Sequence, residues 1–133
     1  MKSKVPWLDR SMITGPYFCL CLSEKSFRQA LKHLKFPEPK WPEWISLGKD
    51  ATTHHLETND EDAHIVCMRP STKHERVQIH ALLVHEAVHI WQAHRDNIGE
   101  DKPGLEHEAY SIQHLSQELM FSYEKQMRRR KAR

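Results

Sequence analysis

Apolar residues first form an unbroken run at residues 17–22, Tyr-Phe-Cys-Leu-Cys-Leu. A continuous run of this length, rich in aromatic residues, predicts a short strand that is buried on both faces. Ser23 follows as a natural helix N-cap. After it, apolar residues recur at helical spacing, at Phe27, Ala30, Leu31 and Leu34. This pattern predicts an amphipathic helix over residues 24–34 that packs on the strand.

Shorter apolar patterns predict two further strands in the middle of the chain. Residues 36–49 contain three prolines, which end the first helix and predict an extended connection. Residues 51–58 alternate weakly between polar and apolar, and residues 63–69 carry the more apolar run His-Ile-Val-Cys-Met. The turn-rich residues 59–62 lie between them, so the two strands are predicted to form a hairpin with a longer loop.

The longest apolar pattern covers residues 75–97 and predicts a helix. It is apolar on nearly every side, as expected of a central helix buried between other elements. Gly99 ends it, and residues 99–104 form a loop before a last helix over residues 105–127. The last helix carries apolar residues on one side, at Leu105, Ala109, Ile112, Leu115 and Leu119. The short loop predicts that it returns antiparallel to the central helix.

These elements predict an α+β protein with a small mixed sheet of about three strands packed on the long buried helix. The length of 133 residues suits one domain, residues 1–133, with a modest core. Residues 1–15 have mixed polarity and end at a Gly-Pro turn signal, so they are predicted to form an irregular arm in which Trp7 packs on the domain. Residues 128–133 are predicted to form a solvated basic tail.

Candidate chemistry is concentrated in the central helix, at His85-Glu86-Ala87-Val88-His89. Side chains four apart lie on one face of a helix about one turn apart, so His85 and His89 can reach a single metal ion. Glu86 then lies beside the same site. This is the H-E-x-x-H arrangement, in which two neutral imidazoles hold zinc and the Glu takes a proton from water.

The apolar surroundings strengthen this interpretation. Three ionisable groups, His85, Glu86 and His89, occur in the most apolar helix of the chain. Burying such groups without partners is costly, and a bound metal ion would compensate that cost. The motif and its setting together therefore predict a zinc site.

A catalytic zinc site commonly takes three protein ligands, and the last helix can supply the third. Glu108 falls on the apolar stripe of that helix, so it is predicted to face the central helix. Glu106 lies about 160° around the helix from Glu108 and is the alternative. His107 and His114 are weaker candidates. The metzincin extension, with a further Gly and His, is excluded because Gln92 and Arg95 occupy those positions.

At these positions the chain resembles the gluzincin branch of zincin metallopeptidases, and in particular its minimal single-domain members, some of them encoded by phages. In that family an H-E-x-x-H helix follows a small mixed sheet, and a Glu on the next helix is the third zinc ligand. Residues 108–111, Glu-Ala-Tyr-Ser, are similar to the N-E-A-x-S-D ligand motif of thermolysin-like enzymes. His107 stands in place of the Asn and Ile112 in place of the Asp.

A second alignment overlaps the first. Residues 106–110 resemble the E-x-x-A-D ligand motif of other gluzincins, which would make Glu106 the ligand and put Tyr110 in place of the Asp. Both alignments imply the same zincin-like fold.

The resemblance implies a zinc-dependent metallopeptidase acting on a peptide or protein substrate. Zinc held by His85, His89 and Glu108 would lower the pKa of a bound water, and Glu86 would accept its proton as the water attacks a peptide carbonyl. By the same resemblance, residues 63–69 would form the edge strand that holds an extended substrate. The alternative is an interaction protein, such as a phage accessory factor, that keeps the zincin scaffold without turnover.

Composition bears on the cellular compartment, the state of the cysteines and the possible binding partners. No apolar run approaches the roughly 20 residues of a membrane-spanning helix, and the polar first ten residues do not resemble a signal peptide, so a cytoplasmic protein is expected. Three cysteines without a secretory context predict buried thiols rather than disulfides. The net charge is +2, and the basic run at residues 128–131 has no aromatic or structured companion, which argues against nucleic-acid binding. Oligomeric state is not predicted.

Overall fold

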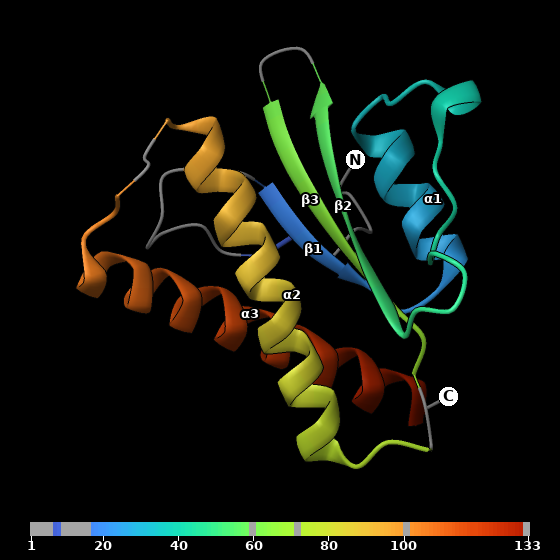
Figure 1. Cartoon of the computed structure of the whole chain (residues 1–133). Helices are drawn as coiled ribbons and strands as arrows, with labels where there is room; N and C mark the ends of the chain where they lie inside the picture. The colour runs from blue at the N-terminus through green and yellow to red at the C-terminus, as the bar shows by residue number, and fades with distance from the viewer. Residues whose placement is uncertain (1–6, 9–16, 59–60, 71–72, 100–101, 132–133) are drawn as a thin grey trace.

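A three-stranded mixed sheet lies at the centre of the protein, in a computed structural model that describes residues 7–8, 17–58, 61–70, 73–99 and 102–131. Its strands are β1 (Tyr17–Cys21), β2 (Ala51–Thr58) and β3 (Glu61–Met68), in the order β1-β3-β2. β1 runs parallel to β3, and β2 runs antiparallel to it (Figure 1). The predicted α+β class with a small mixed sheet is confirmed.

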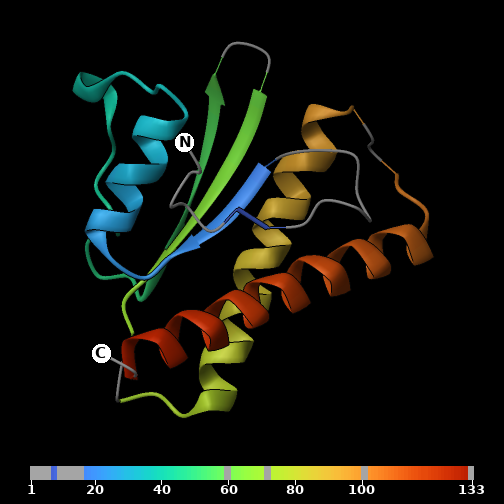
Figure 2. The same ribbon diagram turned by 180° about the vertical axis from the view of Figure 1, so that it is seen from behind.

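Helices cover both faces of this sheet. α1 (Glu24–His33) lies on one face, together with a short 3-10 turn, η1 (Glu38–Lys40). α2 (Arg76–Asn97) and α3 (Leu105–Lys131) lie on the other, as Figures 1 and 2 show from opposite sides. Local sequence explains where these helices begin and end. Ser23 accepts a hydrogen bond from the Ser26 amide at 3.1 Å, as its predicted N-cap role requires, and Gly99 follows α2 with φ of 69°.

The alternation of side chains along each strand separates two hydrophobic cores. The core under α2 and α3 is built from fully buried side chains, Phe18, Leu20, Val66, Leu83, Ile90 and Leu115 among them. The core under α1 is built from the intervening strand positions and from α1, with Cys19, Cys21, Phe27, Leu31, Ile65 and Cys67 among its members. The sheet is thus buried on both faces, as the run at residues 17–22 predicts.

α2 and α3 run in opposite directions, as predicted. Near the start of α2, the Arg76 Nε atom lies 2.7 Å from a carboxylate oxygen of Glu124, late in α3. Near the end of α2, Trp91 donates a hydrogen bond of 2.8 Å to Glu108, in the first turns of α3. In Figure 1, α3 passes obliquely behind α2.

Three predictions about the elements are corrected by the structure. β3 is the central strand and not the edge strand, because it pairs with β1 on one side and β2 on the other. The hairpin is confirmed, but β3 begins at Glu61, so the predicted loop is shorter than residues 59–62. α3 continues to Lys131, so most of the predicted basic tail is helical.

The ends of the chain are described in part. Of the predicted irregular arm, Trp7 and Leu8 are described: Trp7 forms an antiparallel bridge with Cys19 and packs on the α1-side core. The rest of the arm, residues 1–6 and 9–15, lies outside the described residues, as do residues 132 and 133 of the tail.

Candidate metal and catalytic site

The two motif histidines stand side by side on the outer surface of α2. Their Nε2 atoms are 3.1 Å apart, and their rings meet edge to face with centroids 4.8 Å apart. This proximity follows from the helix alone, because residues four apart are neighbours on its surface. Both side chains are exposed. Both rings therefore present the same nitrogen to a shared position that solvent can reach.

The exposure of His85 and His89 differs from the sequence-based prediction of a helix that is buried on nearly every side. Burial of two unpaired histidines in such a helix would be costly. In the structure α2 has an open side, where Val77 is 75% exposed, and His85 and His89 lie on that side. Their solvation therefore needs no metal ion, and the interpretation as a metal site rests on the geometry of the pair.

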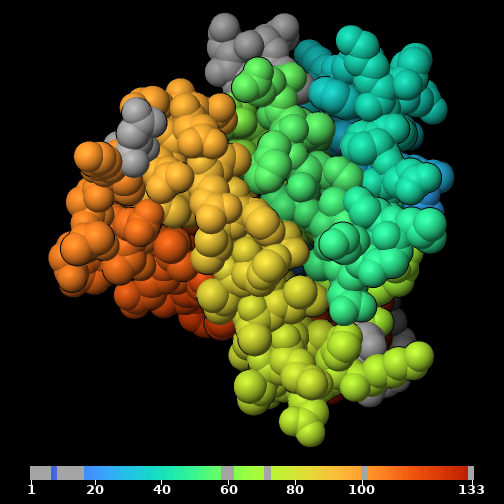
Figure 3. Space-filling model, viewed as in Figure 1, coloured from blue at the N-terminus to red at the C-terminus, as the bar shows by residue number. Residues whose placement is uncertain are grey.

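Glu86 is the motif residue that is buried, with 4% of its surface exposed. It projects towards β2, where the Thr53 hydroxyl donates a hydrogen bond to its Oε2 atom. A carboxylate in this position has the partner that its burial requires, and Oε1 remains as an acceptor. Glu86 is thus fixed at the boundary between α2 and β2, beside the histidine pair. Figure 3 shows α2 and β2 next to each other on this face of the molecule.

The predicted third ligand, Glu108, faces α2 but not the histidine pair. Its Oε2 atom accepts the hydrogen bond from Trp91 and lies 3.9 Å from the Arg95 guanidinium. Trp91 comes two positions after His89, so it projects about 160° away around the helix. The structure brings Glu108 to the α3 side of α2, whereas His85 and His89 lie on its open side.

The other candidates on α3 are also apart from the pair or engaged elsewhere. Glu106 is exposed, and the His107 ring packs edge-on against Trp91 with centroids 5.4 Å apart. His114 is buried at 9% exposure and has a partner. The apolar stripe predicts that Leu105 is buried, but its side chain is 83% exposed, so the first turn of α3 is largely exposed to solvent. Among the described residues, no three His, Cys, Asp or Glu side chains already surround one metal position.

A second cluster of polar residues, which the sequence did not reveal, lies beside the pair. His55 on β2 and His64 on β3 are directly opposite in the register, and their Nδ1 atoms are 2.5 Å apart. The His64 Nε2 atom lies 3.3 Å from Asp62 Oδ2, which also accepts a 2.6 Å hydrogen bond from Asn97 at the end of α2. This chain of contacts depends on the strand register that pairs residues 55 and 64, so it could be predicted only by an alignment of the two strands of the hairpin.

Burial sets the protonation of this cluster. His64 is fully buried, and the loss of solvation lowers its pKa from 6.5 to about 4, although Asp62 opposes the shift. Burial also lowers the pKa of His55, and the nearby His89 lowers it further. His64 is therefore a neutral imidazole at pH 7. The effect of His89 on His55 also indicates that the second cluster and the histidine pair are neighbours.

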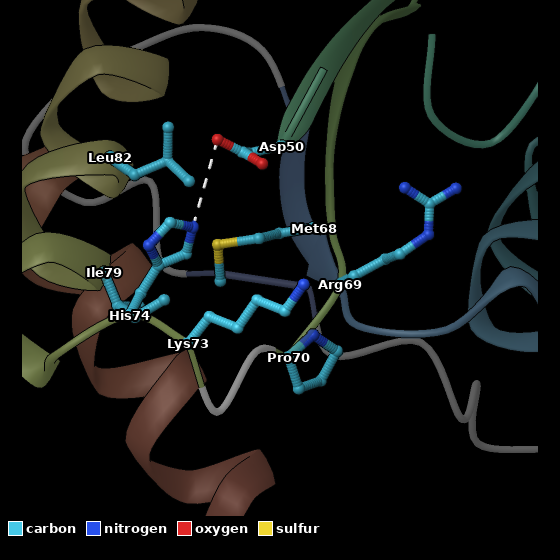
Figure 4. A pocket seen from close by; sticks show the side chains of 8 residues that line it. All are labelled: Asp50, Met68, Arg69, Pro70, Lys73, His74, Ile79 and Leu82. Carbon is cyan, nitrogen blue, oxygen red and sulfur yellow. Dashed lines mark ion pairs between the residues drawn. The ribbon is translucent and has the colours of Figure 1, made fainter. Parts of the chain in front are cut away.

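A pocket of about 330 Å³ lies next to this region, between the start of β2 and the first turns of α2. Figure 4 shows Asp50 and His74 facing each other, with 3.9 Å between carboxylate and imidazole, above the side chain of Met68. Leu82 lines the pocket and lies one helical turn before His85 and Glu86. The pocket does not include the motif residues; its lining comes from Asp50 just before β2, from the end of β3 with the residues that follow it, and from the first turns of α2.

In comparisons with known proteins, no protein-family model, curated protein or solved structure matches the chain. Among the described helices, none is long and apolar enough to cross a membrane.

Proposed function

We propose that this protein is a zinc-dependent metallopeptidase of the gluzincin type, with a zincin-like fold, acting on peptide or protein substrates in the cytoplasm. The observation that carries the proposal is the pair of Nε2 atoms of His85 and His89, 3.1 Å apart on an exposed helix face, with the buried carboxylate of Glu86 beside them. Two exposed imidazoles alone would be unremarkable as surface residues. A buried acid next to them has the composition of a hydrolytic site.

The donor set fits zinc. Two imidazole nitrogens that bind one tetrahedral zinc at about 2.0–2.1 Å stand roughly 3.3–3.4 Å apart, close to the observed separation. Neutral imidazole is a preferred zinc ligand, and Nε2 of both rings faces the shared position. Bound zinc would supply Lewis-acid chemistry, polarising a carbonyl oxygen and lowering the pKa of a coordinated water towards ~7.

The residues of this chain would supply the remaining functions. Glu86 would accept the proton of the attacking water on its Oε1 atom and return it to the leaving amine. Thr53 would keep the carboxylate in place through its hydrogen bond to Oε2. β2 is an edge strand of the sheet and lies along this site, so its unpaired edge could hold an extended peptide by main-chain hydrogen bonds. The adjacent pocket would receive a substrate side chain.

Metal content and turnover test the proposal together. We expect about one zinc per chain when the protein is purified without a metal-affinity tag, and its loss in His85→Ala and His89→Ala. Mass spectrometry of the native protein measures the stoichiometry. Glu86→Gln should keep the zinc and lower hydrolysis of a mixed peptide library by about 10²–10⁴-fold, because it removes the proton acceptor. Wild-type turnover in Glu86→Gln would reject the mechanism.

The alternative function is a non-catalytic interaction or phage accessory protein on the same scaffold. One observation favours it: among the described residues, no three His, Cys, Asp or Glu side chains are already arranged around one metal position. That function predicts no peptide hydrolysis by the wild-type chain, with or without added zinc, and identical partner binding by wild type and Glu86→Gln. The same library assay therefore distinguishes the two functions.

A further inference from the structure

β2 and α2 run side by side in the same direction, which places His55 at the level of the histidine pair. At the lower end, Asp50 shares a pocket with Leu82 of α2. In the middle, Thr53 bonds to Glu86, and at the upper end Asp62 of β3 bonds to Asn97. Residues two apart on a strand project from the same face, so His55 follows Thr53 towards α2.

The spacing of the two elements agrees with this placement. From Thr53 to His55 a strand advances about 6.7 Å, and three residues of helix beyond Glu86 advance about 4.5 Å. Ile90, a further residue on, is buried in the core, whereas His89 is exposed and affects the pKa of His55, so His89 is the neighbour of His55 on this side of the helix. His55 pairs with His64, which is two positions after Asp62 in β3, and Asp62 contacts Asn97 of α2. His55 thus lies between two contacts of the sheet with α2, the one from Thr53 to Glu86 and the one from Asp62 to Asn97.

The polar chain behind His55 engages one of its two ring nitrogens. A carboxylate only accepts, so the His64 Nε2 atom facing Asp62 donates. The other nitrogen of His64, Nδ1, lies 2.5 Å from His55 Nδ1, so the contact with His64 engages the Nδ1 atom of His55. Nε2 is then the nitrogen of His55 that can bind a metal ion, and it is the atom that His85 and His89 also present.

We infer that His55 is the third protein ligand of the metal site, so that the ligand set departs from the His-His-Glu set that the gluzincin resemblance implies, and that His64, Asp62 and Asn97 orient it. The inference rests on the proposed zinc site of His85 and His89. A carboxylate that orients a ligating histidine is a recurrent feature of zinc centres, and here a second imidazole relays it. His55 and the pair are exposed, so their rings can turn to close on the ion when it binds. Glu108, by contrast, is held by Trp91 and Arg95.

Zinc affinity of single variants tests the inference directly. Competition with a chromophoric chelator at pH 7.5 should show that His55→Ala and His89→Ala each weaken zinc binding by about 100-fold or more, since each removes one ligand. His64→Ala should weaken it by about 10–100-fold, because it removes the orienting partner. Glu108→Ala and the exposed control His33→Ala should remain within about threefold of wild type. Circular dichroism of each variant confirms that it is folded.

Cobalt substitution provides a readout that does not depend on affinity. H55C would place a thiolate at the metal, so Co²⁺ should then show a sulfur-to-cobalt charge-transfer band in the near ultraviolet. Wild type and H33C should lack the band, because the native thiols are buried away from the site. The band also identifies the ligand if H55A proves unstable.

The outcomes separate this inference from the proposed function. Loss of zinc in His89→Ala, with wild-type affinity in His55→Ala and no band in H55C, would overturn His55 as a ligand and leave the metallopeptidase proposal intact. Loss of zinc in Glu108→Ala in that case would assign the third ligand to Glu108. Unchanged binding in His85→Ala and His89→Ala would reject the metal site itself, and both proposals with it.

Discussion

The two faces of the sheet are built from the same three strands but have different chemistry. Under α1 the strands contribute thiols and aliphatic side chains, and Cys19, Cys21 and Cys67 are all fully buried. Burial raises the pKa of Cys19 and of Cys67, so these thiols stay protonated and unreactive. Under α2 the face is apolar near β1 but polar towards β2, where Thr53 and His55 project.

Histidines illustrate the difference. On the α1 side, His54 stacks on Phe27 with ring centroids 4.8 Å apart, and its Nε2 atom is 2.9 Å from the carbonyl oxygen of Trp44. Both its ring face and its Nε2 atom are occupied. On the α2 side, His55 contacts His64 through its Nδ1 atom, and its side chain is exposed. Neighbouring residues of one strand can thus have a packing role and a proposed binding role, because each projects from a different face of the sheet.

Removing packing from the α1 side should have the largest effect on stability. Phe27→Ala deletes a ring that is 98% buried, so we expect the free energy of unfolding to fall by about 3–5 kcal/mol. Urea denaturation measures this loss. Zinc affinity of the folded fraction should stay at the wild-type value. A loss below about 1 kcal/mol, or a parallel loss of zinc affinity, would contradict the separation of the two faces.

Acid should destabilise the protein through the α2 side. The unfolded chain protonates His64 near pH 6.5, whereas the folded protein does so only near pH 4, so the unfolded state binds more protons between these values. Stability should therefore fall as the pH drops from 6.5 to 4, by on the order of 3 kcal/mol. Urea midpoints measured against pH in the presence of a chelator test this. His64→Gln should flatten the slope, and the exposed His33→Gln should not.

Glu108 should contribute to helix packing rather than to metal binding. Glu108→Gln weakens the charge-assisted contacts to Trp91 and Arg95, and because its side chain is 34% exposed we expect a loss of only about 1 kcal/mol. Glu106→Gln is the matched control and should be neutral. Thermal unfolding of both variants measures the difference. Equal stability of the two variants would show that the contacts of Glu108 do not join α2 to α3.

The outer surface of α1 should contribute least. Arg28 and Glu24 lie 2.9 Å apart, but both side chains are more than half exposed. Exposed pairs four residues apart on a helix typically contribute about 0.3–0.5 kcal/mol, so Arg28→Ala should change stability by no more than that. Urea denaturation at low and high salt measures it. A larger, salt-sensitive loss would mean that α1 is held by charge as well as by its apolar face.

The local parts of this protein could be predicted from its sequence. The strands, the three α-helices, the Ser23 cap and the Gly99 stop follow from patterns within a few residues. Most elements begin and end within two residues of their predicted positions, and α3, which continues to Lys131, is the exception. The proximity of His85 and His89 is also local, because a single helix determines it. The antiparallel return of α3 follows from the short loop before it.

The arrangement between elements could not be predicted in the same way. A helix that is apolar on nearly every side gives no indication of which side is buried, so the open position of His85 and His89 depends on where the sheet and α3 pack. Glu108 was correctly predicted to face α2, but Trp91 and Arg95 determine where its carboxylate lies.

Local sequence patterns thus specify the secondary structure and one pair of candidate ligands, since both depend on contacts within about one helical turn. The burial of Glu86 against Thr53 and the contact of His55 with His64 follow instead from the packing of separate elements. Those contacts join residues from different elements, and the strand register and the competition among apolar faces for burial select them. A shift of one residue in that register would turn His55 to the opposite face, and no local pattern records such a choice.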